Sequence, residues 1–364
     1  MLCFSRRGAV LALALLTTSA FADDLRVATW NISNYTGSDR TSAIQNAVYG
    51  SFQGRSFSPD VIFAQEIQSN SAANQFVNVL NSASGSPGDW SVTFGSLTGT
   101  SGTNASDSAM FFRTSKVQSV ATVKVGAAAG TSGPPRDTWR FDFTINGSVS
   151  GEIFSAYNVH MKSGTTVDDQ NRRQQEGQLI ANNWSTLGGN RLGMVVGDLN
   201  VQDSSQAMYQ TLTAPGFFAD PIGTPGDWNN NSAFRFVHTQ DPSGNGGMDD
   251  RHDQLLMSAG LHDGVGAEYK GVFGTAYSTT TWDDANHSYR SWGNDGTSFD
   301  NSLTVSGNTM VGSSIAQSLI DTAGTAGGHL PVFADITYST VPEPATLAIV
   351  GLGAAALIRR RRQS

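Results

Sequence analysis

Short apolar runs alternate along the chain with polar stretches and with turns rich in Gly, Asn and Ser. Short runs of β-branched and aromatic residues between turn residues are typical of β-strands. We therefore predict strands at Leu25–Ile32, Val61–Ala64, Ser108–Phe112, Thr138–Ile145, Ile153–His160, Leu192–Gly197, Gln254–Ser258 and Pro331–Ile336.

Helical patterns stand out in two segments, Ser71–Asn81 and Asp168–Leu187. In the second, Ile180, Trp184 and Leu187 recur at i, i+4 and i+7, so they share one face of a helix. Strands and helices that follow one another in this way predict an α/β fold. We find no internal repeat and no linker, which predicts a single domain over residues 23–340.

The segment 264–327 differs from the rest of this domain, because it is rich in Gly, Ser, Thr and Asn. We predict that it is an insertion of loops and edge strands. It also contains Trp282 and Trp292, two large aromatic residues in an otherwise polar stretch.

Composition limits the function classes. With 364 residues, 38% hydrophobic and 14% charged residues, the chain is long enough for a large buried core and resembles neither a coiled coil nor a disordered chain. Residues 23–340 contain 16 basic and 29 acidic residues, a net charge of about −13. This argues against nucleic-acid binding through a broadly basic surface, but not against an enzyme that reaches phosphate through a bound cation.

The N-terminal segment 1–22 has the features of a cleaved secretory signal peptide. Arg6 and Arg7 precede an apolar run, and Ala20-Phe21-Ala22 provides a small-residue cleavage site. The arginine pair is also a partial twin-arginine motif, so the export route stays open. Cys3 is the single cysteine, and it would leave with this peptide. The mature chain would then have neither a disulfide nor a cysteine-ligated zinc site.

The C-terminal segment 341–364 resembles the PEP-CTERM sorting signal of Gram-negative bacteria. Val341-Pro342-Glu343-Pro344 precedes an apolar run over residues 345–358 and then four arginines, 359–362. As a helix the apolar run would be about 21 Å long, short of the ~30 Å hydrocarbon core. We therefore expect export across the inner membrane and transient anchoring. A sorting protease would then process the tag and leave the protein at the cell surface or outside the cell.

Polar residues that can hold a metal or move a proton follow several predicted strands. They are Asn31, Glu66, His160, Asp198, Asn200, Asp253 and His329. Carboxylate and amide oxygens without thiolates suit a hard cation such as Mg²⁺, with Mn²⁺ and Ca²⁺ as alternatives. Two histidines added to such a set suit proton transfer during hydrolysis of an oxygen ester.

In this order and spacing the series resembles the endonuclease/exonuclease/phosphatase superfamily, which includes pancreatic-type deoxyribonuclease, abasic-site endonucleases, bacterial sphingomyelinases and inositol polyphosphate phosphatases. The resemblance covers Leu25 to Thr337. It implies an α/β fold of two packed mixed β-sheets flanked by helices, a four-layer sandwich. It also implies a divalent-metal-dependent phosphoesterase.

The resemblance implies metal-binding roles for Asn31, Glu66 and Asp198, with Glu66 as the main ligand. One position departs from the family pattern. The family places an aspartate, a metal ligand, directly before the last histidine, and here Gly328 stands there. The loss of one carboxylate should weaken metal binding.

The resemblance also implies roles in phosphate binding and proton transfer. His160 would hydrogen-bond the scissile phosphate, and His329, oriented by Asp253, would act as general base or acid. Asn200, together with Asp198, would position the phosphate and the attacking water. Arg136, in Pro-Pro-Arg-Asp, is similar to a phosphate-contacting arginine, with a surface ion pair as the alternative.

Three further features refine the assignment. Asp107, just before a predicted strand, is a candidate to support His160. The segments 246–251 and 289–296 resemble a secreted bacterial branch of the superfamily. Within the first, Asp249 and Asp250 fit either a structural turn, which we favour, or a calcium site.

Three functions remain open at this stage. The first is a secreted nuclease, an endonuclease of DNA or RNA that acts as a monomer. The second is a phospholipid phosphodiesterase or a phosphatase, for which Trp282 and Trp292 could contact lipid. The third is a non-catalytic extracellular matrix or binding protein, which Gly328 and the sorting tag would suit.

Overall fold

The structure is a computed structural model that describes residues 21–340 except 38, 103–104 and 245. Residues 1–20 and 341–364 lie outside the described residues. The signal peptide over 1–22 therefore stays a prediction from sequence.

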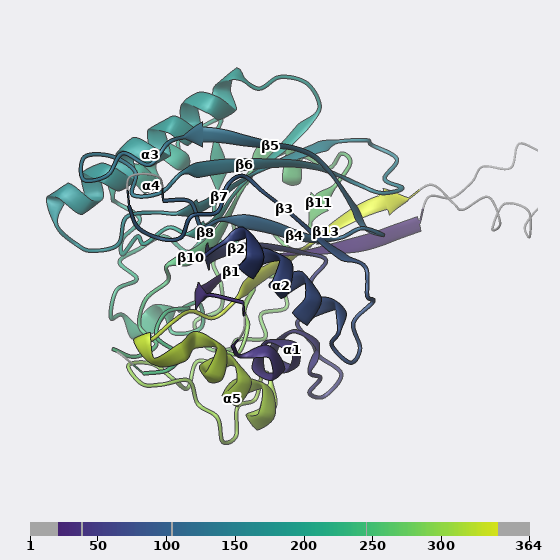
Figure 1. Ribbon diagram of the computed structural model, residues 1–364, viewed down its shortest axis with the longest axis vertical. Coiled ribbons are helices and arrows are strands. Elements are labelled where there is room, and N and C mark those ends of the chain that lie inside the picture. Colours follow the sequence, from purple (N-terminus) through teal and green to yellow (C-terminus); the bar gives the residue numbers. More distant parts are fainter. Residues whose placement is uncertain (1–20, 38, 103–104, 245, 341–364) are drawn as a thin grey trace, which may run out of the picture.

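The described strands form two β-sheets that pack face to face (Figure 1). The first sheet has the order β11-β13-β1-β2-β4-β3, with β12 paired to β13. Its strands are β1 Phe21–Tyr35, β2 Val61–Ile67, β3 Trp90–Phe94, β4 Ala109–Arg113, β11 Glu268–Tyr269, β12 Arg290–Ser291 and β13 Val332–Thr340. The second sheet has the order β5-β6-β7-β8-β10-β9. Its strands are β5 Val117–Gly126, β6 Thr138–Ile145, β7 Ile153–His160, β8 Arg191–Asp198, β9 Phe218–Ala219 and β10 Asp253–Ser258.

Both sheets are mixed, because each contains one parallel pair among antiparallel neighbours. Strand β1 runs parallel to β2, and β7 runs parallel to β8. The carboxyl ends of these parallel strands meet at the same edge of the molecule. Two packed mixed sheets with helices on their outer faces confirm the predicted fold class.

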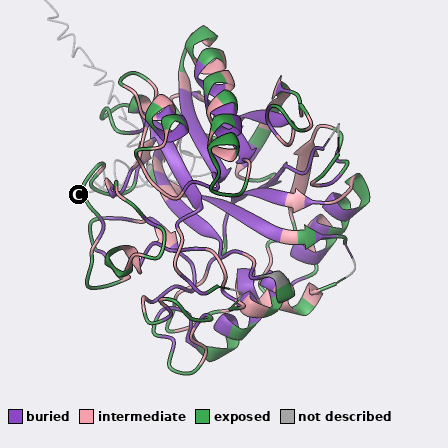
Figure 2. Cartoon of the chain, turned by 90° about the vertical axis from the view of Figure 1, so that its left-hand side faces the viewer, coloured by how far each residue is buried: buried purple, intermediate pink, exposed green. Residues whose placement is uncertain are grey.

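Helices cover the outer face of each sheet and complete four layers (Figure 1). They are α1 Thr41–Tyr49, α2 Asn70–Asn81, α3 Val167–Thr186, α4 Ala207–Leu212 and α5 Gly312–Ala323. Helices α1, α2 and α5 share one apolar cluster with the first sheet, and α3 and α4 share another with the second. A third cluster fills the space between the sheets. Figure 2 shows the consequence, with buried strands in the centre and exposed residues on the outer sides of the helices.

The two-residue period of the strands carries polar side chains to one end of the central cluster. In β1, Leu25 and Val27 face the second sheet and Asn31 continues the same face. In β8, Met194 and Val196 face the first sheet, and the strand ends at Asp198 on the same face. An apolar face between two sheets therefore ends in a polar group in each sheet.

The predicted strands and helices are all present, with boundaries shifted by a few residues. The pattern missed β3, β5, α1, α4 and α5 as well as the shortest strands. Strand β5 lies at a sheet edge and most of its residues are at least partly exposed, so its apolar alternation is weak.

The segment 264–327 was predicted as loops and edge strands, and this is only partly right. It does supply β11 and β12, which pair with β13. It also contains helix α5, whose buried Ile315, Ala316 and Leu319 pack on the first sheet. The Gly-Ser-Ser start of this helix hid its periodicity, because those residues favour loops.

The two ends of the described chain lie side by side, since Phe21 pairs with Thr340 in the antiparallel β1–β13 ladder. His329 precedes β13, at the opposite end of that strand from Thr340. Among the described residues, no helix combines the length and the apolar character that crossing a bilayer requires.

A substitution in the central cluster tests the packing between the sheets. Phe63 is fully buried, and its ring lies 6.2 Å from those of both Phe141 and Phe143 on the opposite sheet. Phe63→Ala should lower the free energy of unfolding by about 3–5 kcal/mol because it leaves a cavity. Val120→Ala on exposed β5 is the control and should have little effect. Urea unfolding measures both, and equal losses would contradict this packing.

Candidate active site

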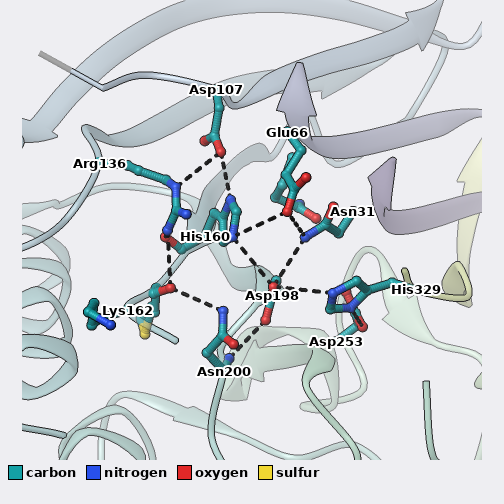
Figure 3. A network of polar contacts seen from close by, with 12 residues as sticks. Asn31, Glu66, Asp107, Arg136, His160, Lys162, Asp198, Asn200, Asp253 and His329 are labelled. Atoms are coloured by element: carbon teal, nitrogen blue, oxygen red, sulfur yellow. Dashed lines mark hydrogen bonds and ion pairs between the residues drawn. The ribbon is translucent and has the colours of Figure 1, made fainter. Parts of the chain in front are cut away.

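The polar ends of the strands converge in one cleft between the edges of the two sheets (Figure 3). Asn31 and Glu66 come from β1 and β2 of the first sheet. His160, Asp198 and Asp253 come from β7, β8 and β10 of the second. The residues just before β13 add His329, so side chains up to 298 residues apart in sequence share one site.

The amide of Asn31 joins two carboxylates at the centre of this cleft. Its Nδ2 donates to Glu66 Oε1 at 3.0 Å and to Asp198 Oδ2 at 3.2 Å. Asp198 is 1% exposed, and its second oxygen accepts from the backbone N–H of Asn200 at 2.9 Å. A carboxylate buried this deeply requires such donors, because an unpaired buried charge is strongly unfavourable.

Two histidines face Asp198 from opposite sides. The Nε2 atoms of His160 and His329 lie 3.6 Å and 3.7 Å from the same atom, Asp198 Oδ2. His160 Nε2 is also 3.8 Å from Glu66 Oε1. The four side chains therefore form one compact polar cluster, with both imidazoles in contact with Asp198.

Each histidine has its own orienting carboxylate behind it. Asp107 Oδ2 lies 2.6 Å from His160 Nδ1, and Asp253 Oδ2 lies 2.7 Å from His329 Nδ1. Both carboxylates are fully buried, and Asp253 also accepts from the hydroxyl of Thr239. Such a bond at Nδ1 holds the ring so that Nε2 faces the cleft.

The charges of the cleft shift the pKa values of its members. Burial alone would lower the pKa of His329, but Asp253, Asp198 and Glu66 raise it to about 10. Burial raises the pKa of Asp198, yet His329 and His160 outweigh burial and leave it below its usual value. Burial is likewise outweighed at Asp107, where His160 and Arg136 lower the pKa. The carboxylates of Asp198 and Asp107 are therefore ionised at neutral pH.

Backbone conformation aims two of these side chains. The alternation of side chains along β2 would turn Glu66 away from the cleft, because its neighbour Gln65 faces the second sheet. Glu66 instead has φ 63°, and Asn200 has φ 49°, both in the left-handed region that side chains other than glycine seldom adopt. Backbone strain of this kind gathers at functional sites, where surrounding contacts hold it in place.

A layer of buried amides separates the site from the apolar core. Gln65 Nε2 donates to Asn158 Oδ1 at 2.7 Å across the gap between the sheets. Asn158 Nδ2 donates to the carbonyls of Ala64 and Ala109 at 3.1 Å. Neither residue was predicted from the sequence, although Asn158 lies two positions before His160 and so shares its face of β7.

Arg136 and Asn200 lie on the His160 side of the cleft (Figure 3). Arg136 Nη1 donates to the carbonyls of His160 and Met161, and its Nε is 3.3 Å from Asp107 Oδ2. Asn200 Nδ2 also donates to the Met161 carbonyl. Both predicted substrate-binding residues thus hold the chain around His160, and Arg136 is not a surface ion pair.

A buried glutamate, which the sequence analysis did not single out, lies behind Arg136. Glu176 of α3 is 2% exposed, and its Oε1 accepts from the hydroxyl of Thr138 at 2.9 Å. Its Oε2 has no hydrogen-bond partner among the described residues. Burial raises the pKa of Glu176 to about 7, which favours a neutral carboxyl group.

In the described part of the chain, no hydrogen bond or ion pair joins the other candidate residues to His160, His329, Glu66 or Asp198. Asp249 and Asp250 occupy an irregular segment and not a hydrogen-bonded turn, and burial raises the pKa of Asp249 to about 6. Trp292 is 2% exposed and stacks on Phe57 in the core. Trp282 lines a separate cavity that none of the predicted site residues borders.

The donor set of the cleft fits a hard divalent cation with few protein ligands. Glu66 and Asp198 are close enough to share one amide donor, and a cation between them would relieve their repulsion. Asn31 presents its nitrogen to them, because its Oδ1 accepts from the N–H of Ser33, so it would have to turn its amide to act as a ligand. Among the described residues, no three His, Cys, Asp or Glu side chains form a ready metal site.

The structure gives a reason for the absence of a carboxylate at position 328. Gly328 has φ 67°, and a Cβ there would lie 2.5 Å from both Cβ and the carbonyl oxygen of Ala323. Any side chain would require the end of α5 to move. The departure from the family pattern is thus built into the local backbone.

Comparison with known proteins identifies the family of this chain and its sorting motif. Residues 28–298 match the Endonuclease/Exonuclease/phosphatase family, and residues 340–362 match the PEP-CTERM protein-sorting motif. No curated protein matches this chain in sequence.

Solved structures share the fold at low sequence identity. An endonuclease/exonuclease/phosphatase family protein from Bacteroides thetaiotaomicron is 16% identical, with a TM-score of 0.50 over 88% of this chain and 97% of that one. The D. rerio TDP2 structure complexed with single strand DNA product is 10% identical, with a TM-score of 0.51 over 86% of this chain and 98% of that one.

Two glycine substitutions test the constraint at position 328. Gly324 also has a positive φ, 73°, but a Cβ there would meet no atom within 4 Å. Gly324→Ala should therefore lower the free energy of unfolding by about 1–3 kcal/mol, only because its backbone conformation, φ 73° and ψ −162°, suits glycine alone. Gly328→Ala should lose about 1–3 kcal/mol more, because its Cβ also clashes with Ala323. Thermal unfolding compares them, and equal losses would show that space at 328 is not limiting.

The raised pKa of Glu176 predicts a loss of stability as pH rises. The unfolded state releases this proton near 4.5 and the folded state near 7, so the folded state loses up to about 3 kcal/mol between these values. Glu176→Gln keeps the shape and should remove this loss. The variant should be more stable than the parent at about pH 8 and similar at about pH 4, as measured by urea unfolding. A constant difference at both pH values would contradict the shift.

Proposed function

The chain belongs to the endonuclease/exonuclease/phosphatase family, whose members are phosphoesterases, and we propose that it is an exported nuclease. The proposed activity is divalent-metal-dependent hydrolysis of phosphodiester bonds in DNA or RNA. The observation that carries the proposal is the pair of imidazole Nε2 atoms, 3.6 Å and 3.7 Å from Asp198 Oδ2, each backed by a buried carboxylate.

Glu66 and Asp198 are the proposed metal ligands, joined by Asn31 if its amide turns. Members of the family generally depend on a divalent metal, and Mg²⁺ is the ion we propose, with Mn²⁺ or Ca²⁺ as alternatives. Such a cation would place positive charge against the phosphate oxygens and offset the carboxylates that raise the pKa of His329.

The protein's own groups divide the remaining tasks. Asp253 holds His329 so that its Nε2 can accept a proton from the attacking water or return one to the leaving group. Asp107 holds His160 so that its Nε2 can donate to a phosphate oxygen. Asp198 Oδ1 accepts from the backbone N–H of Asn200, and Asn200 Nδ2 donates to the Met161 carbonyl. Asn200 and Asp198 would together orient the water and the phosphate.

Arg136 would contribute positive charge to phosphate binding. Its Nε and Nη1 are held by Asp107 and by the carbonyls of His160 and Met161, so the guanidinium has a fixed position beside His160. A fixed guanidinium suits phosphate oxygens, which it can bind with two N–H groups.

A nucleic-acid substrate is favoured over phospholipid by the surroundings of the cleft. The tryptophans that could have contacted lipid do not take part in it, because Trp292 is buried in the core and Trp282 lines a separate cavity. D. rerio TDP2, solved with a single strand DNA product, shows that this fold can hold such a strand. A phosphatase and a non-catalytic binding protein remain as alternatives. Gly328 removes one expected carboxylate, yet both histidine–aspartate pairs are in place.

The PEP-CTERM motif indicates export and sorting to the cell surface. We propose that the tag anchors the chain transiently until a sorting protease removes it, and that the protein acts as a monomer. Because His329 and Thr340 lie at opposite ends of β13, the cleft is at the far end of that strand from the last described residue. Such an orientation suits a substrate outside the anchoring membrane.

Hydrolysis assays test the proposed function directly. The full-length protein should nick plasmid DNA or cleave RNA with Mg²⁺, Mn²⁺ or Ca²⁺, and excess chelator should abolish this. His329→Ala and Glu66→Ala should each reduce the rate by about 100-fold or more, because they remove a proton-transfer group and a metal ligand. His262→Ala alters an exposed histidine outside the cleft and serves as the control.

The substrate panel separates the alternatives. Preferential hydrolysis of sphingomyelin would favour a phospholipase, and preference for p-nitrophenyl phosphate would favour a phosphatase. If the folded protein hydrolyses none of these substrates with any of the three cations, the catalytic proposal is wrong and a binding role is favoured.

A further inference from the structure

A cavity of about 460 Å³ adjoins the cleft on the side of His160. Arg136, Lys162 and Arg172 line it, together with hydroxyl groups of Thr100, Thr131 and Ser163. We refer to it as the basic cavity. No acidic residue of the described chain lines it, although the body of the protein has a net charge of about −13.

Of the three basic side chains of the basic cavity, Arg136 and Lys162 each have one acidic partner, and Arg172 has none among the described residues. Arg172 is 8% exposed, and its Nε and Nη2 donate to the carbonyls of Gly133 and Gly130. No carboxylate of the described residues pairs with it. The carbonyl partners fix the guanidinium and leave its full charge beside the cavity.

Lys162 also contributes positive charge to the basic cavity, but one acidic residue pairs with it. Its Nζ lies 2.8 Å from Asp169, which also caps helix α3 and whose pKa is lowered to about 2 by Lys162 and Thr166. Beneath it, fully buried Arg173 donates to the carbonyls of Lys162 and Gly164. The Arg173 guanidinium has no ion-pair partner in the part of the chain that the structure describes, so the loop after β7 remains positively charged.

The basic cavity and the cleft share one residue. Arg136 lines the cavity and also donates to the His160 carbonyl, and Figure 3 shows Arg136 and Lys162 together on the side of His160 away from His329. A ligand with one phosphate beside His160 could therefore place a neighbouring phosphate in the cavity. Among the described residues, no atom accepts a hydrogen bond from Arg136 Nη2, which leaves this donor for a phosphate.

We propose that the basic cavity is a subsite for the second phosphate of a polynucleotide strand, a proposal that rests on the proposed function. A strand carries phosphates at short, regular intervals, so a fixed positive charge next to the scissile position selects for it. A single phosphodiester, such as a lipid headgroup, has no second phosphate to place there. The subsite would explain how an acidic protein selects a polyanion with three basic residues and the hydroxyl residues beside them.

Lys162→Gln tests the subsite without disturbing the cap of α3, which Thr166 and Asp169 form by themselves. The measurement is the ratio of kcat/KM for a single-stranded oligonucleotide to that for bis-p-nitrophenyl phosphate, with Mg²⁺. The ratio should fall about tenfold, because one charge-assisted contact is lost. Lys270→Gln is the matched control, since Lys270 also pairs with an aspartate, Asp24, but lies outside the site. It should leave both rates unchanged.

Thr131 provides a test in the opposite direction. It is exposed at the wall of the basic cavity, so Thr131→Lys should raise the same ratio and Thr131→Gln should leave it unchanged. For Lys162→Gln, the slope of log affinity for the oligonucleotide against log salt should shrink by about 0.7, the value expected for one lost phosphate contact with a single strand. Thermal unfolding of each variant shows whether it is folded.

Binding measurements separate this proposal from the proposed function. If the protein hydrolyses both substrates but Lys162→Gln and Thr131→Lys leave the ratio unchanged, the subsite is wrong and the nuclease proposal stands. If it hydrolyses neither substrate, the affinity for the same oligonucleotide, measured by fluorescence anisotropy, still tests the subsite. Weaker binding by Lys162→Gln, with no change for Lys270→Gln, would support the cavity, and equal binding by all variants would overturn it.

Discussion

The site depends on the burial of one carboxylate, Asp198, between two sheets. With 1% of its surface exposed, its charge is tolerable because Asn31, the backbone of Asn200 and the two histidines surround it. An unpaired charge at this depth would cost several kcal/mol. Each partner comes from a different strand or loop, so the pairing of the sheets and the electrostatics of the cleft stabilise each other.

The need to pair buried polar groups also explains the residues that surround Asp198. The amides of Gln65 and Asn158 connect the sheets where apolar packing ends, so polar atoms near the cleft find partners within the protein. Asp107 and Asp253 hold the histidines in place from behind. The chemistry of the site is therefore preorganised by hydrogen bonds whose donors and acceptors are themselves buried, which keeps the imidazoles in position without a ligand.

Charge is distributed unevenly around this centre. The carboxylates concentrate negative charge on one side of His160, where a cation would bind, and the basic cavity concentrates positive charge on the other. Gly328 limits the negative charge of the first part, since the backbone near Ala323 leaves no space for a further carboxylate. A cleft with separate negative and positive parts can accept a metal and a polyanion together, even in a protein whose overall charge is negative.

The sequence predicted the fold class and the candidate site through its resemblance to one family and through polar residues, such as Asn31, His160 and Asp198, that follow apolar strand patterns. It could not show weakly patterned edge strands, nor the positive φ of Glu66, since backbone turns leave little trace in apolar periodicity. It also could not show which carboxylate supports which histidine or that Arg136, Lys162 and Arg172 border one cavity. Those relations are distances between segments remote in sequence, and only the packing of the two sheets fixes them.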